Sequence, residues 1–203
     1  MTEAARAIHD DKSVEKAMPA LAGLIKDRRF KGEPLLRRAI SACQRVGGEQ
    51  QLRLLIDFAG DSKVPVVLRA EAMAALGTWA KPSEVDRVDG WYRGVINRDP
   101  TGVRNAVRPQ ASFWLKFREP ELVLATARMI RELELTDFNA QMADLVRKHS
   151  SAAVRSGIFP LLSELKYAEM ESLLETALRD RDAAVRKSRS EEHTSELQSP
   201  YVI

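Results

Sequence analysis

A chain of 203 residues, 44% hydrophobic, 30% charged and with a formal net charge of +3, has the composition of an ordinary folded protein with room for a sizeable core. No apolar run approaches the roughly 18 to 20 residues that a membrane-spanning helix needs, and residues 1–20 carry charges where a signal peptide would be apolar. We therefore expect a soluble chain with no export signal and no membrane partner.

Apolar residues at helical spacing predict a chain of helices joined by short turns. The expected helices span about 2–9, 13–26, 33–46, 49–59, 65–80, 99–114, 119–134, 137–149, a segment from Val154 to Leu165, and 167–178, and one more begins at Asp182. Pro19 predicts a kink in the second of them. Residues 81–97 contain Pro82, Gly90 and Gly94, so we expect a long loop there, with at most a turn or two of helix.

One helix sets a pattern that recurs along the chain. Its apolar residues lie at i, i+4, i+8 and i+11, and an arginine, Arg69, follows the first of them. The apolar residues are Leu68, Ala72, Leu76 and Trp79, and the same layout begins again at Val103 and at Val154. The arginines of this pattern are Arg37, Arg69, Arg104, Arg155 and Arg186, at intervals of 32, 35, 51 and 31 residues. The pattern predicts two helices per unit of about 31–35 residues, with one unit enlarged by an extra helix between 104 and 155, and this arrangement is an α-solenoid.

The turn followed by V-R or L-R and then small and aliphatic residues resembles the HEAT-repeat superfamily over residues 33–188. The fold implied for residues 1–188 is all-α, a solenoid of HEAT-like antiparallel helix pairs. In that family the residue after the turn often pairs with an acidic group of a neighbouring repeat, which is the role implied for Arg69, Arg104, Arg155 and Arg186.

The stretch LRAEAMAALGTWAKPSEVDRV at 68–88 carries a more specific resemblance. It is similar to the helical segment of large bacterial exported proteins that join a sorbosone- or glucose-dehydrogenase-like β-propeller to a c-type cytochrome. The resemblance implies an oxidoreductase parent whose catalytic and haem domains are not in this sequence, and a periplasmic or exported location.

The arginines of the pattern allow two interpretations. They could line a concave surface and hold nucleic-acid phosphates, or they could brace the repeats by donating hydrogen bonds to carboxylates and to carbonyls at helix N-termini. The second is favoured because the arginines share one register beside the core positions. Two further basic clusters, Arg28-Arg29-Lys31-Arg37-Arg38 and Arg147-Lys148, are interpreted as solvated turns because, apart from Phe30, they lack the interleaved aromatic residues that base stacking needs. A nucleic-acid partner is therefore not expected.

The aromatic residues divide into two groups. Trp79 and Trp114 occupy equivalent positions of the pattern and are predicted to lie in the core. Trp91 and Tyr92 lie in the irregular loop, where they either pack over the adjacent repeat, which is the favoured prediction, or contact a partner.

No residues form a recognisable catalytic, cofactor-binding or metal-binding motif. His9 and His149 stand without a second ligand at metal-binding spacing, and Cys43 is predicted to be a small buried hydrophobe. The single cysteine excludes an internal disulfide, a CxxC knuckle and a CxxCH haem site, and GxGxxG, Walker A, HExxH and GxSxG are absent from the sequence. We expect no catalytic, cofactor or metal site, and hence no enzyme.

Residues 189–199, RSEEHTSELQS, read as the translation of a common DNA sequencing-library adapter. We therefore expect 189–203 to be a disordered, non-native tail and the genuine chain to stop near Ser188 as a fragment of a longer protein. Removing one arginine and three glutamates from 32 basic and 29 acidic residues leaves 31 and 26, a net charge of +5, which is weak for a nucleic-acid binder.

These observations support three hypotheses for function. The first is a non-catalytic helical-repeat scaffold that holds a protein partner or a neighbouring domain of its parent chain. The second is the helical module of an exported dehydrogenase and cytochrome protein. The third is a nucleic-acid-binding solenoid that resembles HEAT-like DNA repair glycosylases.

Overall fold

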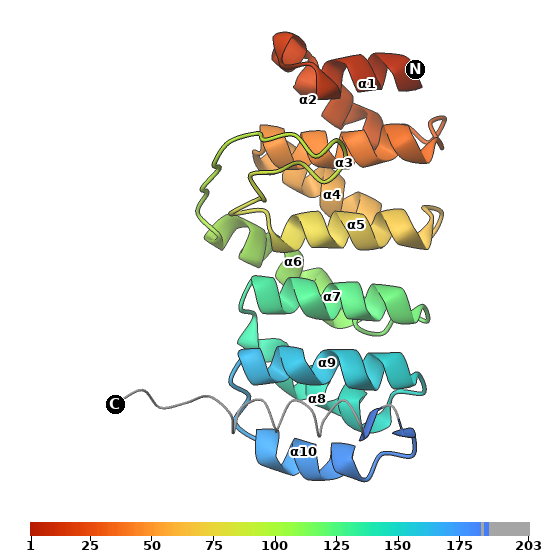
Figure 1. Ribbon diagram of the computed structural model, residues 1–203, viewed down its shortest axis with the longest axis vertical. Helices are drawn as coiled ribbons and strands as arrows, with labels where there is room; N and C mark the ends of the chain where they lie inside the picture. The colour runs from red at the N-terminus through yellow and green to blue at the C-terminus, as the bar shows by residue number, and fades with distance from the viewer. Residues whose placement is uncertain (184, 187–203) are drawn as a thin grey trace. The chain divides into compact units, whose positions relative to one another are not determined.

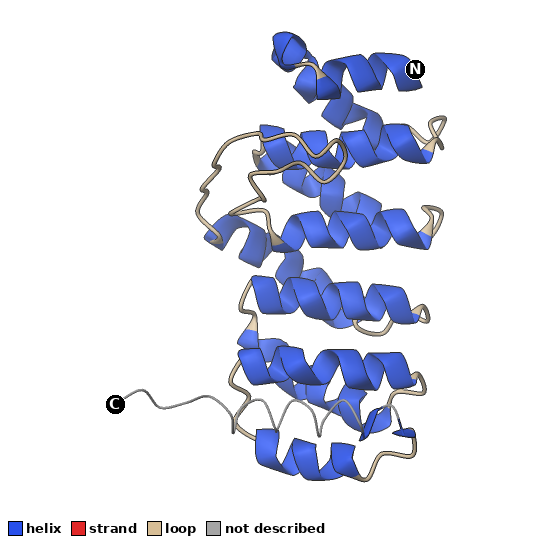
Figure 2. Cartoon of the chain, in the orientation of Figure 1, coloured by secondary structure: helices blue, strands red, loops and turns tan. Residues whose placement is uncertain are grey.

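A computed structural model of the chain describes residues 1–183, 185 and 186. Within these residues the protein is all-helical, as the sequence predicts, with ten α-helices, three 3-10 segments and no β-strand (Figures 1 and 2). The expected tail at 189–203 lies outside the described residues. Two compact units make up the chain, an N-terminal unit of residues 1–133 and a C-terminal unit that begins at Glu134.

Two layers of helices form the N-terminal unit. Its α-helices are α1 (Thr2–Asp10), α2 (Met18–Gly23), α3 (Glu33–Val46), α4 (Glu49–Gly60), α5 (Val66–Gly77), α6 (Thr101–Trp114) and α7 (Pro120–Glu132). Helices α1, α3, α5 and α7 pack side by side in one layer, and α2, α4 and α6 form the other (Figure 1). Each helix of the second layer also packs on the helix that follows it in the chain, which gives the pairs α2–α3, α4–α5 and α6–α7.

The C-terminal unit is built around α8. A 3-10 turn, η3 (Thr136–Phe138), leads into α8 (Asn139–Lys148), which is followed by α9 (Ala152–Glu164) and α10 (Met170–Leu178). Helix α8 packs against both α9 and α10, so its side chains Met142, Ala143 and Val146 are buried.

The buried side chains of four helices repeat in one register. In each of α3, α5, α7 and α9, six buried residues lie at positions k, k+1, k+4, k+5, k+7 and k+8. The first position is Leu35, Leu68, Leu122 and Val154 respectively, so the intervals are 33, 54 and 32 residues. This spacing buries one continuous helix face, and the same spacing recurs in all four helices.

The backbone confirms the same register at the helix ends. Gly47, Glu134 and Lys166 have φ of 72°, 53° and 52°, and each lies 12 residues after the first buried position of its repeat. A left-handed residue just after the last helical turn is a common way to end a helix. The fourth equivalent position is Ala80, where the chain enters a long loop instead.

The position of the insertion in the repeats differs from the prediction. The extra 21 residues, the excess of 54 over 33, lie in the loop between α5 and α6, not between Arg104 and Arg155. Arg104 belongs to α6, which lies in the other layer, so its helix is not a copy of α5. The apolar stripe of α6 resembled that of α5 because any half-buried helix has apolar residues at spacings of three and four.

The assignment of Arg37 to the pattern is also wrong, by one residue. Leu36 occupies the position of Arg69 in α3 and is 4% exposed, whereas Arg37 points out of the core toward Glu33 and Glu71. Since a helix turns by about 100° per residue, a shift of one moves a side chain from the edge of the buried face to the surface.

The predicted helix at 13–26 is divided into three segments. A 3-10 turn (Lys12–Ala17), α2 and a second 3-10 turn (Leu24–Lys26) follow one another. Pro19 lies in the first turn of α2, where the missing N–H costs no hydrogen bond, so it begins a helix and does not kink one. The remaining predicted helices agree with the structure to within a few residues.

The repeat register predicts which leucines carry stability. Leu76→Ala and Leu162→Ala, at equivalent positions that are 0% exposed, are expected to lower the free energy of unfolding by about 2–5 kcal/mol each. The control is Val67→Ala, because Val67 precedes the buried position and is 49% exposed, and its cost is expected to stay near 0.5 kcal/mol or less. Urea denaturation measures all three, and a loss as small as the control's at both leucines would contradict the register.

Candidate interaction surface

The loop that separates α5 from α6 is closed and internally hydrogen-bonded. The N–H of Arg98 donates to Ala80 O at 2.8 Å and so joins the two ends of the loop. Within it, Arg93 N donates to Glu84 O at 2.6 Å and Asp86 N to Trp91 O at 2.9 Å, around an antiparallel bridge between Val85 and Tyr92. The loop was predicted from its prolines and glycines, and its hairpin was not.

Arg98 fastens the end of this loop to two helices. Its guanidinium donates to Trp79 O at 2.8 Å, and to Gln44 O at 2.8 Å and Arg45 O at 3.0 Å at the end of α3. The last carbonyls of a helix have no partner within the helix, so the arginine supplies one. Gly47 leaves the space for this contact, because a Cβ there would lie 2.7 Å from the Arg98 Nε. Burial lowers the pKa of Arg98. The three carbonyls and the face of the Trp79 ring stabilise its guanidinium.

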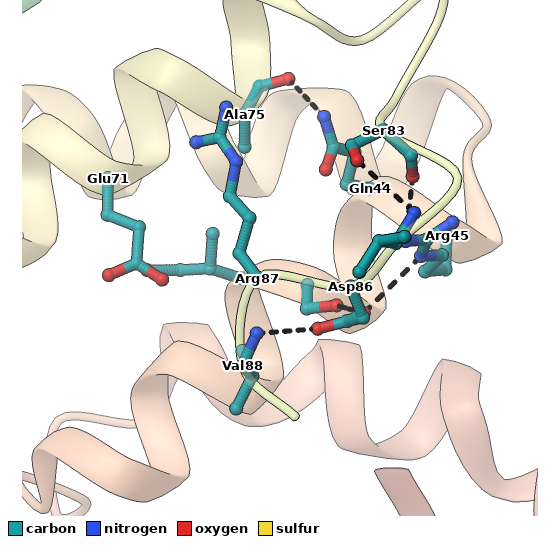
Figure 3. Close-up of a pocket in the computed structure, with 11 residues that line it drawn as sticks. Gln44, Arg45, Glu71, Ala75, Ser83, Asp86, Arg87 and Val88 are labelled. Atoms are coloured by element: carbon teal, nitrogen blue, oxygen red, sulfur yellow. Dashed lines mark hydrogen bonds and ion pairs between the residues drawn. The ribbon is translucent and has the colours of Figure 1, made fainter. Parts of the chain in front are cut away.

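A buried aspartate holds the middle of the loop against α3. Asp86 is 3% exposed, and its carboxylate accepts hydrogen bonds from the Ser41 hydroxyl at 2.6 Å and from Val88 N at 2.8 Å. Figure 3 shows the Arg45 guanidinium beside this carboxylate, with the Arg45 Nε at 3.4 Å and the Arg45 Nη2 donating to Ser83 O at 3.0 Å. Burial alone would raise the pKa of Asp86, but hydrogen bonds from His9, Ser41 and the Val88 N–H together hold that pKa well below its ordinary value.

His9 of α1 completes the contact from the opposite side. The ring is 1% exposed, its Nδ1 lies 2.8 Å from Asp10 Oδ1 and its Nε2 lies 3.0 Å from the Ser41 hydroxyl. Since Ser41 donates its only proton to Asp86, both ring nitrogens of His9 face hydrogen-bond acceptors. Arg93 of the loop donates to His9 O at 2.7 Å and pairs with Asp89.

The described residues contain one cluster with the side chains of a metal site, His9, Asp10 and Asp89. The sequence does not indicate this cluster, because Asp89 is 80 residues from His9. Arg38 pairs with Asp10 at 2.9 Å and Arg93 pairs with Asp89, so guanidinium groups already neutralise both carboxylates. A dication would add to this positive charge and would need His9 without a proton on Nδ1, so we interpret the cluster as the anchor of the loop.

Four apolar side chains of the loop are exposed. Trp91 is 64% exposed, Tyr92 56%, Val95 58% and Val85 49%. The favoured prediction, that Trp91 and Tyr92 pack over the adjacent repeat, is therefore wrong, and the alternative of a partner contact remains. Other apolar residues of the loop are covered, since Pro82 is buried and Val88 and Ile96 are half-buried.

Three arginines of the predicted pattern brace helix ends. Arg69, 3% exposed, donates to Ala59 O at 2.9 Å near the end of α4 and lies 4.5 Å from the ring centroid of Phe117. Arg155 donates to His149 O at 2.7 Å just after α8, and Arg104 donates to Leu133 O at 2.7 Å just after α7. The predicted role is confirmed, but the carbonyls belong to helix C-termini, not N-termini, because only C-termini leave carbonyls unpaired.

Acidic partners account for much of the remaining basic charge. Arg155 also makes a bidentate pair with Asp180 at 2.7 and 2.8 Å, and Arg186 donates to Asp180 O at 2.7 Å. The predicted basic clusters form these ion pairs: Arg28 with Asp61, Arg29 with Asp27, Arg37 with Glu33 and Glu71, Arg38 with Asp10, Arg147 with Glu169 and Lys148 with Asp144. Lys31, the remaining residue of those clusters, is exposed.

The predicted core residues are buried. Trp79 and Trp114 are 4% and 1% exposed. Cys43 is fully buried, its Sγ contacts Ala22 O at 3.5 Å, and burial raises the pKa of the thiol to about 12, so the thiolate is not available. His149 caps the turn before α9, where its Nδ1 accepts a hydrogen bond from Ser151 N at 3.1 Å.

Comparisons with family models, with curated proteins and with solved structures find no match to this chain. None of the helices in residues 1–183 is both long and apolar enough to cross a membrane.

The anchoring of the loop can be tested by limited proteolysis. Asp86→Ala is expected to raise the rate of tryptic cleavage after Arg87 about tenfold or more, because the loop loses its bonds to Ser41 and Arg45. Glu84→Ala is the matched control, since the Glu84 side chain is exposed and only its backbone carbonyl is used. Circular dichroism shows whether the helices persist. Equal cleavage of the folded Asp86 variant and the wild type would contradict the anchor.

The pair of Arg155 and Asp180 predicts a pH dependence of stability. Hydrogen bonds from Arg155 lower the pKa of Asp180 from 3.8 to about 2. Because the folded-state pKa lies below the unfolded one, the pair stabilises fully above pH 3.8 and its contribution is lost as the pH falls toward 2. Chemical denaturation between about pH 5 and pH 2 should therefore show a steeper loss for the wild type than for Asp180→Asn. Asp144→Asn, at an exposed pair, should keep the wild-type slope, and a common slope for all three proteins would refute this assignment.

Proposed function

We propose that the protein is a non-catalytic helical-repeat scaffold, a HEAT-like α-solenoid, that holds a protein or a neighbouring domain through the loop at 80–98. The repeat of 32–33 residues, with two helices per unit, supports the solenoid. The exposure of Trp91 and Tyr92 on a loop tied to the helices supports the contact. Aromatic side chains held in place lose little entropy when they bind, and they are enriched where binding energy concentrates in interfaces.

The chemistry of the loop favours binding over catalysis. The carboxylates of Asp86 and Asp89, together with His9, Arg45 and Arg93, are used in hydrogen bonds and ion pairs at this anchor, so none of these groups is positioned as an available acid, base or nucleophile. The similarity of residues 68–88 to the helical segment of dehydrogenase and cytochrome proteins would make the partner a neighbouring domain. The bracing role of Arg69, Arg104 and Arg155 weighs against a nucleic-acid partner, because their guanidinium groups are used inside the protein.

A selection experiment tests the loop as a binding surface. Phage-displayed peptides are selected on the full chain and then measured on Trp91→Ala/Tyr92→Ala. We expect most of the enriched peptides to lose affinity about tenfold or more on the double variant, because its apolar contacts are gone. Phe113→Ala is the matched control, since Phe113 of α6 is an aromatic residue that is 62% exposed. Enriched peptides that bind the wild type and the double variant equally would contradict the proposal.

A further inference from the structure

A pocket of about 540 Å³ lies in the N-terminal unit between two consecutive repeat turns. The turn at 27–32 leads into α3, and the turn at 61–65 leads into α5. The 3-10 turn Leu24–Lys26, Leu36 of α3 and the residues from Leu54 to Phe58 of α4 supply the rest of the wall. This volume is within the range of pockets that bind ligands, and the pocket shares no lining residue with the loop at 80–98.

The floor of the pocket is apolar. It is formed by Ile25, Phe30, Leu36, Leu54, Phe58 and Val64. Three of these side chains, Ile25, Leu36 and Phe58, are 4–6% exposed and belong to the core, while Phe30, Leu54 and Val64 are half-buried. The half-buried side chains leave apolar surface open to a ligand, and covering it would be favourable by the hydrophobic effect.

The rim of the pocket is basic and incompletely paired. Lys26, Lys31 and Lys63 are exposed, and their ammonium groups form no hydrogen bond or ion pair with the described residues. The other charged groups of the rim are largely satisfied, since Arg28 pairs with Asp61, and Asp27 pairs with Arg29 outside the pocket. Asp57 is the remaining carboxylate of the lining, so the three lysines leave an excess of positive charge around the apolar floor.

We propose that this pocket is a docking site for an acidic peptide segment that inserts a bulky apolar side chain onto the floor while its carboxylates face the three lysines. An apolar floor alone would accept any hydrophobic group, and a basic rim alone would accept any polyanion. The apolar floor and the basic rim together select a segment in which acidic and bulky apolar side chains alternate. The docking site is independent of the loop at 80–98, and it supplies the scaffold with a second contact of defined charge.

The test uses a fluorescein-labelled peptide, Asp-Glu-Asp-Leu-Phe-Asp-Glu-Glu, in anisotropy titrations with the full chain. We expect micromolar binding at low salt. We expect a loss of about tenfold or more for the charge-reversed triple variant Lys26→Glu/Lys31→Glu/Lys63→Glu, and a similar loss when Leu-Phe of the peptide is replaced by Ser-Ser. The matched control reverses three other exposed lysines, Lys81→Glu/Lys116→Glu/Lys166→Glu, which changes the net charge by the same amount and should leave the affinity within about twofold.

Four results would overturn the proposal. They are the absence of binding to the wild type, equal losses for the two triple variants, undiminished binding of the Ser-Ser peptide, and equal or tighter binding of a single-stranded oligonucleotide of the same charge. Leu54→Asp gives a second check, because it places a carboxylate on the half-buried wall and should abolish binding of the peptide while α4 remains folded by circular dichroism. Trp91→Ala/Tyr92→Ala should bind the peptide like the wild type, so a failure here is distinct from a failure of the loop.

Discussion

The ion cluster between α1, α3 and the loop at 80–98 is the constraint on which the proposed surface depends. Long loops normally cost conformational entropy and stay mobile, and the exposed Val85, Trp91, Tyr92 and Val95 of this one lack the apolar contacts that could hold it. Asp86, His9 and Arg93 replace those contacts with charged hydrogen bonds in a buried setting, where each partner would be costly to leave unpaired. The loop is therefore held as part of the fold, and its exposed aromatic side is a defined surface.

Helix ends explain where several buried or half-buried arginines lie. Arg69 and Arg155 occupy the same repeat position and reach back to the carbonyls that end the preceding helix, and Arg98 does the same for α3 from the end of the loop. The same position is Leu36 in α3 and Val123 in α7, both buried. An arginine is therefore one of two solutions at this position, the other being an aliphatic side chain that only packs.

Much of the fold could be predicted from the sequence, because apolar spacing and prolines mark the helices strongly. The register of the buried residues was harder to predict than the helices themselves. The stripe of α6 looks like that of α5, so taking α6 as a copy of α5 placed the insertion between Arg104 and Arg155, since a stripe alone does not distinguish the two layers. The hydrogen-bonded anchor of the loop could not be predicted from the sequence. Its residues His9, Ser41 and Asp86 are separated by 32 and 45 residues and meet only through the packing of α1 on α3. Burial of Cys43 and Trp114 followed directly from their helix faces, and Trp79 is buried just after the end of α5.

The central claim is that the loop is an ordered surface before any partner binds. Amide hydrogen exchange of the isolated protein, measured residue by residue, tests it most directly. The account predicts that the amides of Asp86, Arg93 and Arg98, which donate to Trp91, Glu84 and Ala80, exchange about a hundredfold or more slowly than in an unstructured chain, while the exposed amides between them do not. Exchange of all of them at the rate of an unstructured chain would contradict it.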